Sequence, residues 1–253
     1  MERCKLALML PTFNRAALLY DFVRRLQELL NLKKFDPWLY IIDDASHTSQ
    51  RRENEWVIKR LTIPYTFHVE VKNNGRDYHW RLFNKFCKMI RERPFDYAIM
   101  FADDLYLCNH FFERVMLHFD WLREQNEDFL AFSYLSSWPR NWAKIEFVDG
   151  AFVAVPKFFE VLGWEIPRMP QRIRRHKGQR LPVAGFYKYI TYKFANHPKY
   201  KIAPISPVSY AKVLNVPSML LPTNIYGERE RNWRWLNYNF IDQYPSWPEV
   251  ENV

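Results

Sequence analysis

Glycine is scarce in this chain, which contains only six glycines among 253 residues. Neither of the two common glycine-rich phosphate loops, G-x-G-x-x-G and G-x-x-x-x-G-K-[S/T], occurs in it. If the chain binds a phosphate group, side chains or a metal ion must therefore hold that group in place of a nest of backbone amides.

Long apolar runs and clustered cysteines are also absent. No apolar run approaches the roughly 20 residues that a membrane-spanning helix needs. The short apolar run that ends at Pro11 is too short for a signal peptide. The three cysteines, Cys4, Cys87 and Cys108, do not have the spacing of metal ligands. We therefore expect a cytoplasmic protein with reduced thiols and no integral membrane association.

Acidic residues are missing from residues 166–227. This basic segment holds eleven of the 37 Lys and Arg residues. The rest of the chain has the other 26 and all 28 acidic residues, so the whole positive excess comes from this segment. Such asymmetry predicts a polyanionic partner, and a solvated basic face is the alternative. Aromatic residues flank the cations, a combination that can grip phosphates and stack bases. The candidate contacts are Arg172, Arg174, Arg175, Lys177 and Arg180.

Apolar residues, which make up 48% of the chain, follow an alternating strand and helix pattern. The expected strands lie at 5–10, 38–42, 66–71, 97–101, 129–135 and 151–155. The expected helices lie at 15–30, 48–61, 80–91, 109–123, 157–162 and 186–195. The alternation predicts an α/β fold with a mainly parallel sheet flanked by helices. No clean linker is visible, so we treat residues 1–253 as a single domain.

Three details of these helices can be checked against a structure. Asn14 is expected to cap the first helix and Asn109 the fourth, because asparagine is a favoured helix cap. Trp56, Val57 and Leu61 are expected to form the inner face of the second helix.

Polar side chains follow several of the expected strands. Asp103 and Asp104 end the strand at 97–101, and two adjacent carboxylates repel unless a cation or solvent relieves them. Mg2+ and Mn2+ take oxygen ligands of this kind. The strand ends of a parallel sheet converge, so residues 11–15, 43–46 and 74–76 can line the same cleft. The combination suits a nucleoside diphosphate, and a solvated turn is the alternative for the Asp pair alone.

Four of these stretches, in this order, resemble the signatures of GT-A fold glycosyltransferases of the family 2 type. They are Leu8 to Arg15, Ile41 to Ser46, Asn73 to Arg76 and Ile99 to Asp104. The resemblance covers about residues 5–107, and fainter likeness extends over 148–205. It implies a GT-A (Rossmann-like) sheet, with a nucleotide-sugar-binding half at 1–107 and an acceptor-side half at 108–253.

The resemblance also implies roles for single residues. Asp44 would lie near the nucleobase or ribose, and Arg76 near the uracil or pyrophosphate. Asp103 and Asp104 would be the DxD-type pair that holds Mn2+ or Mg2+, with Asp104 as the direct ligand. Pro11 and Thr12 would shape the nucleoside pocket through backbone contacts. The other candidates for donor binding are Asn14, Arg15, Asp43 and Asn74.

The sequence departs from the family pattern in two places. Ala45 stands where the family usually has glycine. The Glu-Asp pair that supplies the base in many inverting members is expected near residues 181–186, which contain no carboxylate. Asp149 and Glu165 are the nearest candidates for a base, which must lie within hydrogen-bond reach of the acceptor hydroxyl. A retaining mechanism or another base stays open.

The sequence thus predicts a metal-dependent glycosyltransferase that moves a sugar from a nucleotide-sugar, with UDP favoured, to a hydroxyl acceptor. The basic segment favours a polyanionic acceptor such as a hydroxymethylated base in DNA, which would have to be flipped out of the duplex. One alternative is transfer to a surface polysaccharide or lipid-linked glycan. Another is a non-catalytic nucleic-acid-binding module on a degenerate transferase scaffold.

Overall fold

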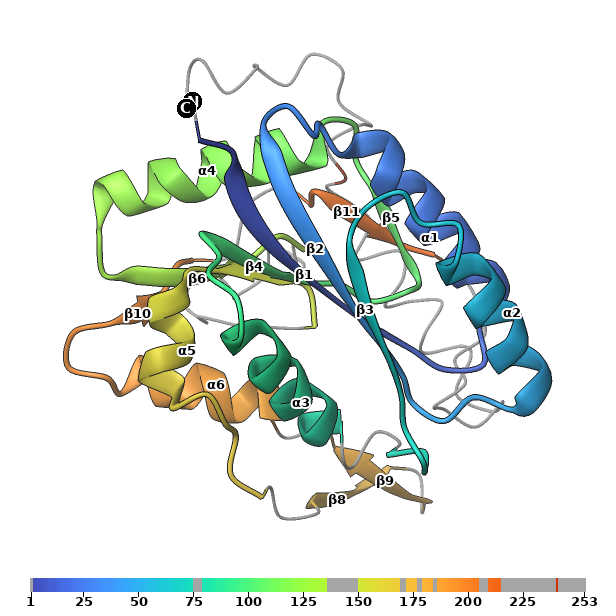
Figure 1. The fold of residues 1–253 in the computed structure, drawn as a ribbon. Coiled ribbons are helices and arrows are strands. Elements are labelled where there is room, and N and C mark those ends of the chain that lie inside the picture. Colours follow the sequence, from blue (N-terminus) through green and yellow to red (C-terminus); the bar gives the residue numbers. More distant parts are fainter. Residues whose placement is uncertain are drawn as a thin grey trace.

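A sheet of seven strands, in the order β10-β6-β7-β4-β1-β2-β3, forms the centre of the computed structural model (Figure 1). The structure describes residues 2–74, 79–135, 150–168, 172–176, 179–183, 186–204, 209–214 and 240. The strands of the sheet are β1 (Cys4–Thr12), β2 (Phe35–Asp43), β3 (Tyr65–Val69), β4 (Tyr97–Met100), β6 (Phe129–Ser133), β7 (Phe152–Ala154) and β10 (Lys201–Ile202). Only β7 is antiparallel to its neighbours β4 and β6, so the predicted mainly parallel sheet is confirmed.

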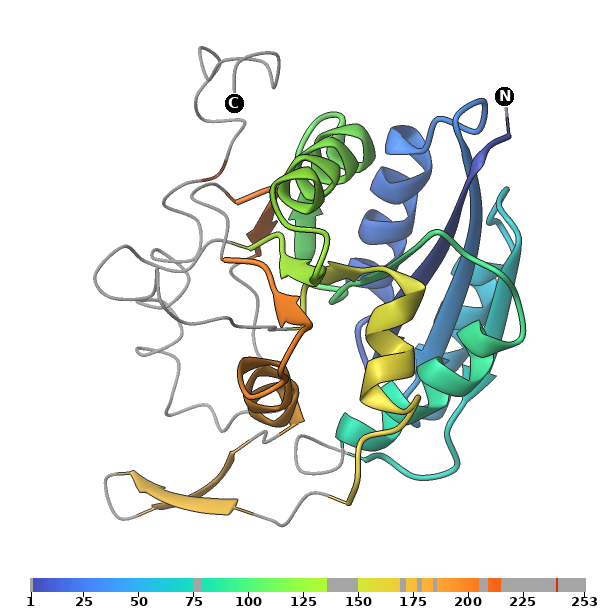
Figure 2. The same ribbon diagram turned by 90° about the vertical axis from the view of Figure 1, so that its left-hand side faces the viewer.

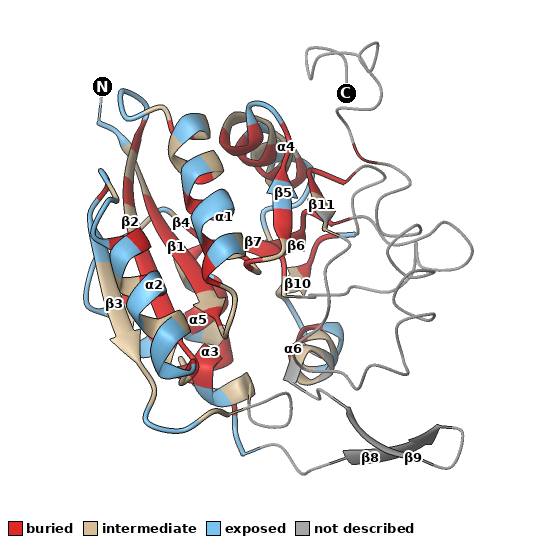
Figure 3. Ribbon diagram, turned by 90° about the vertical axis from the view of Figure 1, so that its right-hand side faces the viewer, coloured by how far each residue is buried: buried red, intermediate tan, exposed pale blue. Residues whose placement is uncertain are grey.

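The helices cover both faces of this sheet. They are α1 (Ala16–Leu29), α2 (Thr48–Ile58), α3 (His79–Arg91), α4 (Phe111–Gln125), α5 (Pro156–Leu162) and α6 (Phe186–Ala195). The chain steps outward from β1 to β3 and then returns across β1 to β4. Because such crossovers are right-handed, α1 and α2 share one face and α3 lies on the other. Figure 3 shows α1 and α2 together in front of the buried strands β1 and β2.

Aromatic side chains fill the space between the helices and the sheet. On the α1 side, Phe101 contacts Phe22 and Phe111, with ring centroids 5.3 and 5.9 Å apart. On the α3 side, Phe158 of α5 stacks on Phe194 of α6 at 4.9 Å and also contacts Phe152 of β7. Since both faces are covered, the inner strands read as continuous apolar runs and not as an alternating pattern.

The two expected asparagine caps are wrong, because each asparagine has a tertiary partner. Asn14 has a left-handed backbone (φ 52°), and its Oδ1 accepts a hydrogen bond from the amide of His47 in the next loop. The helix α1 begins at Ala16, and Arg15 precedes it. Asn109 accepts a hydrogen bond from Arg25 of α1 through its Oδ1, and α4 begins two residues later.

The expected inner face of α2 is wrong at Trp56. This side chain is 51% exposed, and the guanidinium of Arg60 lies over its ring at 3.4 Å. The buried residues of α2 are Asn54, Val57 and Ile58. Val57 and Ile58 follow Asn54 by three and four positions, so they lie on the same face of the helix as Asn54.

Two small sheets were not expected from the sequence. One pairs β5 (Leu105–Leu107) with β11 (Ala211–Val213), and the other pairs β8 (Arg172–His176) with β9 (Gln179–Val183). Figure 2 shows the β8–β9 hairpin beyond α6 and away from the main sheet. The strands β5 and β11 have only three residues each, and β8 reads Arg-Ile-Arg-Arg-His, so these segments lack the apolar run that marks the strands of the main sheet.

The three cysteines are free thiols, and two of them are buried. Burial raises the pKa of the Cys4 thiol to about 12 and also raises that of Cys87, so neither is a reactive thiolate near neutral pH. Within the part of the chain that the structure describes, no helix is long and apolar enough to span a bilayer.

A histidine in α4 should make folding stability depend on pH. His118 packs against the ring of Phe132, and its Nδ1 lies 2.9 Å from the hydroxyl of Tyr210. Burial lowers the pKa of His118 from about 6.5 to about 4. The unfolded chain therefore binds a proton first as the pH falls, and this stability is lost between about pH 6.5 and pH 4.

The prediction is that the native chain loses about 1–2 kcal/mol more stability between pH 7 and pH 5 than a His118→Phe variant does. Urea unfolding of both proteins at the two pH values measures the difference. Burial also lowers the pKa of His79 to about 4, but this histidine is present in both proteins and cancels in the comparison. Equal pH dependence in the two proteins would show that His118 titrates normally.

Candidate active site

The carboxylate pair lies in the turn between β4 and β5, at the carboxyl end of β4. Thr12, at the end of β1, donates a hydrogen bond from Oγ1 to Oδ2 of Asp103 at 2.8 Å. One nitrogen of Arg15, Nη1, donates to Oδ1 of Asp103 at 2.9 Å and to Oδ2 of Asp104 at 3.1 Å. Groups more than 80 positions apart in the chain are thus joined, because β1 and β4 are adjacent parallel strands.

Burial and the positive charge of Arg15 act in opposite directions on the pKa of Asp103 in this cluster. Burial raises the pKa of Asp103 to about 6, the positive charge of Arg15 opposes that rise, and the neighbouring Asp104 adds to it. The two carboxylates share one guanidinium nitrogen, and their oxygens are of the kind that Mg2+ and Mn2+ bind.

Asp44 ties the end of β2 to the loop after β3. Its Oδ1 accepts hydrogen bonds from the amide and the side chain of Asn74, at 2.9 and 2.7 Å. Asn73 donates from Nδ2 to the backbone oxygen and to Oδ2 of Asp44, at 2.9 and 3.1 Å. The amide of Asp44 in turn donates to the backbone oxygen of Thr12. Asp44 therefore lies at the same edge of the sheet as the carboxylate pair.

Asp43 is engaged in the turn that leads to α2. Its side chain is buried, with Oδ1 accepting from the amide of Ser46 at 2.7 Å and Oδ2 accepting from Nδ2 of Asn54 at 2.9 Å. Ala45 between them has a left-handed backbone (φ 60°), a conformation that costs a non-glycine residue about 1–2 kcal/mol. The place where the family usually has glycine is thus a position at which glycine would relieve strain.

The loops after β1 and β2 are hydrogen-bonded to each other. The amide of Asn14 donates to Oγ of Ser46 at 2.8 Å, and the amide of Ala16 donates to Oε1 of Gln50 at 3.1 Å. Pro11 precedes this loop and lies opposite Ile42 in the register of β1 and β2. The strand ends that the sequence placed in one cleft therefore converge, although the roles of their residues in binding stay predictions.

Of the other predicted residues, some lie outside the described part of the chain and some lie in other elements. Arg76, Asp149 and Lys177 lie outside the described residues. Glu165 is exposed in the segment after α5, and no hydrogen bond among the described residues joins it to the carboxylate pair. The remaining acceptor candidates belong to the β8–β9 hairpin, where Arg175 pairs with Arg180; Arg172 and Arg174 pair with Val183 and Leu181.

Three lysines of the basic segment have structural partners. Lys193 donates from Nζ to the backbone oxygen of Leu162 at the end of α5, and burial lowers its pKa. Lys201 donates to the backbone oxygens of Ala195 and His197 near the end of α6. Lys199 lies 3.6 Å from a carboxylate oxygen of Asp128. Part of the basic character of this segment therefore satisfies helix ends and is not directed at a partner.

The carboxylate pair fits a metal that takes part of its ligands from a substrate. Within the described ranges, no group of three or more His, Cys, Asp or Glu residues could hold a metal ion. Mg2+ and similar hard cations are commonly bound by one or two carboxylates together with waters and substrate phosphates. Asp103 and Asp104 supply oxygen ligands of that number and kind.

Three contributors to the site were not recognised as such in the sequence. Arg15 was expected to bind the donor, but its bridge between the two carboxylates was not foreseen. Thr12 was expected to act through its backbone, whereas its hydroxyl binds Asp103. The amide of Leu214, next to β11, donates to the backbone oxygen of Asp104 at 2.8 Å. The charge of Arg15 and the hydroxyl of Thr12 are signals that the sequence contains. Nothing in the sequence around Leu214 indicates that its backbone amide contacts Asp104.

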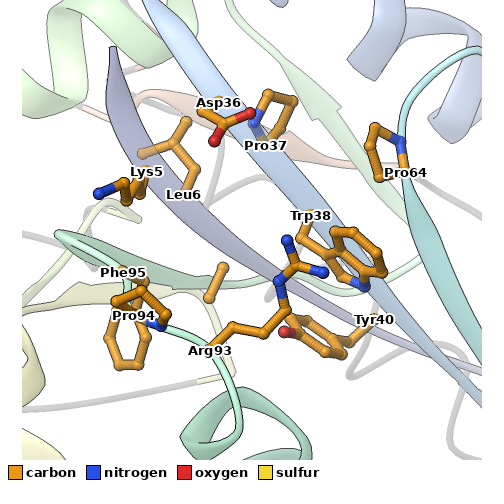
Figure 4. A pocket seen from close by; sticks show the side chains of 11 residues that line it. Lys5, Leu6, Asp36, Pro37, Trp38, Tyr40, Pro64, Arg93, Pro94 and Phe95 are labelled. Atoms are coloured by element: carbon orange, nitrogen blue, oxygen red, sulfur yellow. The ribbon is translucent and has the colours of Figure 1, made fainter. Parts of the chain in front are cut away.

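A hollow lies at the opposite edge of the sheet, by the amino ends of β1 and β2. Its volume is about 140 Å3. Figure 4 shows Lys5, Asp36, Trp38 and Arg93 around it, and the Arg93 guanidinium lies 3.5 Å from the centre of the Trp38 ring. The strands β1 and β2 begin at this edge and end at the edge where the carboxylate pair lies. The hollow is therefore separate from the candidate active site.

The chain has the GT-A type of fold found in nucleotide-sugar glycosyltransferases. The mannosyltransferase PcManGT from Pyrobaculum calidifontis, solved with GDP-Man and Mn2+, superposes with a TM-score of 0.56 at 15% identity, covering 82% of this chain and 58% of that one. TarS from S. aureus, solved with UDP-GlcNAc, superposes with a TM-score of 0.56 at 11% identity, covering 85% of this chain and 60% of that one.

The chain therefore spans about three fifths of the length of these two structures. No protein-family model and no curated protein matches the sequence. At such low identity the likeness establishes the fold, and the activity has to be argued from the site.

Proposed function

We propose that this chain is a metal-dependent glycosyltransferase that moves a sugar from a nucleotide-sugar, with UDP favoured, to a hydroxyl acceptor. The observation that carries the proposal is the joining of Asp103 and Asp104 to Thr12, Arg15 and Asp44 at the carboxyl edge of a parallel sheet. Ligands of open α/β sheets bind at this edge. The two solved neighbours with the same fold carry GDP-Man and UDP-GlcNAc.

In this proposal the nucleoside binds between the loops after β1, β2 and β3. Asp44 and Asn74 already hydrogen-bond each other there, so the loop that would contact the nucleobase or ribose is held in place before the donor arrives. Asn14 and Asp43 act by holding the loops on either side. Pro11 shapes the pocket through its backbone.

The diphosphate binds next to the carboxylate pair. Mn2+ or Mg2+, held by Asp104 and Asp103, would neutralise the charge that develops on the leaving diphosphate. Arg15 already places a positive charge beside the two carboxylates. We propose that Arg76 adds a second positive charge next to the diphosphate. Preorganised positive charge at a leaving group is among the largest contributions to catalysis.

The acceptor hydroxyl loses its proton to a base while its oxygen attacks the anomeric carbon of the sugar. Asp149 and Glu165 stay our candidates for this base. Asn84 of α3 fixes the backbone of Ile166 through both of its side-chain atoms, so the neighbouring Glu165 projects from an anchored segment. A retaining mechanism remains the alternative if neither carboxylate serves.

For the acceptor we propose a polyanion that carries a hydroxyl group, such as a hydroxymethylated base in DNA. The support is the basic segment, and within it the hairpin in which Arg175 pairs with Arg180 across two strands. The lysines at helix ends do not contribute to this argument. A cytoplasmic location completes the proposal and is compatible with three free thiols.

Incubation with radiolabelled UDP-glucose, UDP-GlcNAc or GDP-mannose, together with Mn2+, tests the activity. The acceptors are duplexes containing hydroxymethylcytosine or hydroxymethyluracil, an unmodified duplex, and soluble or lipid-linked glycans. We expect label in a hydroxymethylated duplex and none in the unmodified control, and none in either when EDTA is present.

Label in a glycan alone would keep the transferase and reject DNA as the acceptor. No label anywhere, no binding of UDP or GDP with Mn2+, and salt-sensitive binding to plain DNA would favour the non-catalytic nucleic-acid-binding module. The measurements thus separate the three functions.

A further inference from the structure

A single guanidinium nitrogen of Arg15 contacts the carboxylate oxygens that a metal ion would bind. Nη1 of Arg15 contacts Oδ1 of Asp103 and Oδ2 of Asp104, at 2.9 and 3.1 Å. The three side chains are only 13%, 7% and 14% exposed, so water does little to screen these ion pairs. In this arrangement Arg15 forms an ion pair with both carboxylates.

A divalent cation at the same oxygens must therefore compete with Arg15. The guanidinium and the cation would lie close together in a poorly hydrated place, where like charges repel strongly. Moving Arg15 away from these oxygens gives up two poorly hydrated ion pairs, which is unfavourable unless another anion takes their place. The cation alone is consequently a poor ligand for this protein.

A diphosphate supplies such an anion. Guanidinium groups bind phosphate oxygens through paired hydrogen bonds, and Arg15 stands at the start of α1 beside the carboxylates that a metal-bound diphosphate would approach. Thr12 meanwhile keeps its own hydrogen bond to Oδ2 of Asp103. The carboxylate therefore stays oriented after Arg15 has left Oδ1.

We propose that Arg15 couples metal binding to donor binding. It pairs with Asp103 and Asp104 when no metal is bound, opposes a cation that arrives alone, and turns to the diphosphate when cation and nucleotide bind together. Because coupling is reciprocal, the nucleotide strengthens metal binding by the same factor as the metal strengthens nucleotide binding. The half of this inference that concerns the diphosphate rests on the proposed function, whereas competition with the bare cation does not.

The test measures Mn2+ binding by electron paramagnetic resonance, with and without UDP, in the native protein and in Arg15→Met. We expect the variant to bind Mn2+ alone at least about tenfold more tightly, because the competing charge is gone. We also expect the factor by which UDP strengthens Mn2+ binding to shrink at least about tenfold.

Two further variants separate charge from structure. Arg15→Lys keeps the positive charge and should restore weak binding of Mn2+ alone. Arg24→Met lies on the same helix but pairs with Glu28 at the surface, so it should behave like the native protein. Thermal unfolding should show that Mn2+ alone raises the melting temperature of Arg15→Met more than that of the native protein.

The inference is overturned if Arg15→Met binds Mn2+ alone no more tightly than the native protein, or if Arg15→Lys binds it as tightly as Arg15→Met. Failure of the proposed function looks different. In that case the native protein would not bind UDP even with Mn2+, while the gain in Mn2+ binding by Arg15→Met could still be observed and would support the competition.

Discussion

Replacing Asp104 by asparagine should weaken the binding of UDP in the presence of Mn2+ by at least about 100-fold, or about 3 kcal/mol. The change removes a charged oxygen ligand from a site where, among the described residues, no group of three or more metal-binding side chains is present. The amide side chain has nearly the same size, and the contact from the Leu214 amide goes to the backbone oxygen of Asp104, so the turn should keep its shape.

Isothermal titration calorimetry of UDP with saturating Mn2+ measures this loss. The matched control is Asp36→Asn, the same chemical change near the start of β2, where Asp36 makes a half-exposed ion pair with Arg3. It should bind UDP as the native protein does. Native-like UDP affinity in a folded Asp104→Asn variant would show that Asp104 is not a metal ligand.

Replacing Asn84 by leucine should cost about 2–5 kcal/mol of folding stability. The Asn84 side chain is buried, its Oδ1 accepts from the amide of Ile166 at 2.7 Å, and its Nδ2 donates to the backbone oxygen of Ile166 at 2.8 Å. Leucine fills a similar volume but leaves both buried backbone groups without this partner, and each such group costs about 1–3 kcal/mol. Urea unfolding at neutral pH measures the loss.

Asn196→Leu is the comparison, since Asn196 is exposed and its amide bonds only to the backbone of Tyr192, one turn earlier. That change should cost about 0.5 kcal/mol or less. Equal losses of folding stability in the two variants would mean that the two hydrogen bonds from Asn84 to Ile166 do not stabilise the fold. Because Ile166 follows Glu165, sugar transfer should also fall in Asn84→Leu if Glu165 is the base.

The convergence of the site could be predicted because it follows from topology. The parallel strands of a sheet all end at the same edge. Once β1, β2 and β4 were recognised as strands, Thr12, Asp44 and Asp103 could therefore be expected to lie close together. Their strands were recognisable because both faces of the sheet are covered, which makes the strand sequences uniformly apolar. The apolar runs of the strands, a local feature of the sequence, were thus enough to predict that the distant strand ends converge.

Features that depend on one distant partner could not be predicted. The strands β4, β6 and β7 were expected, but the antiparallel position of β7 between the other two depends on contacts between distant segments. The strands β5 and β11 have three residues each and carry no periodic signal. Asn14 and Asn109 have the residue type of helix caps, yet each serves a neighbouring loop or helix. The bridge of Arg15 likewise appears only when β1 and β4 lie side by side.

A crystal grown with UDP and Mn2+ and measured at the manganese absorption edge tests the central claim most directly. The account predicts an anomalous peak within about 2.0–2.3 Å of a carboxylate oxygen of Asp104 and of a diphosphate oxygen, with the nucleoside against Asp44. A nucleotide bound away from this edge, or one bound here with no manganese at Asp103 or Asp104, would contradict it.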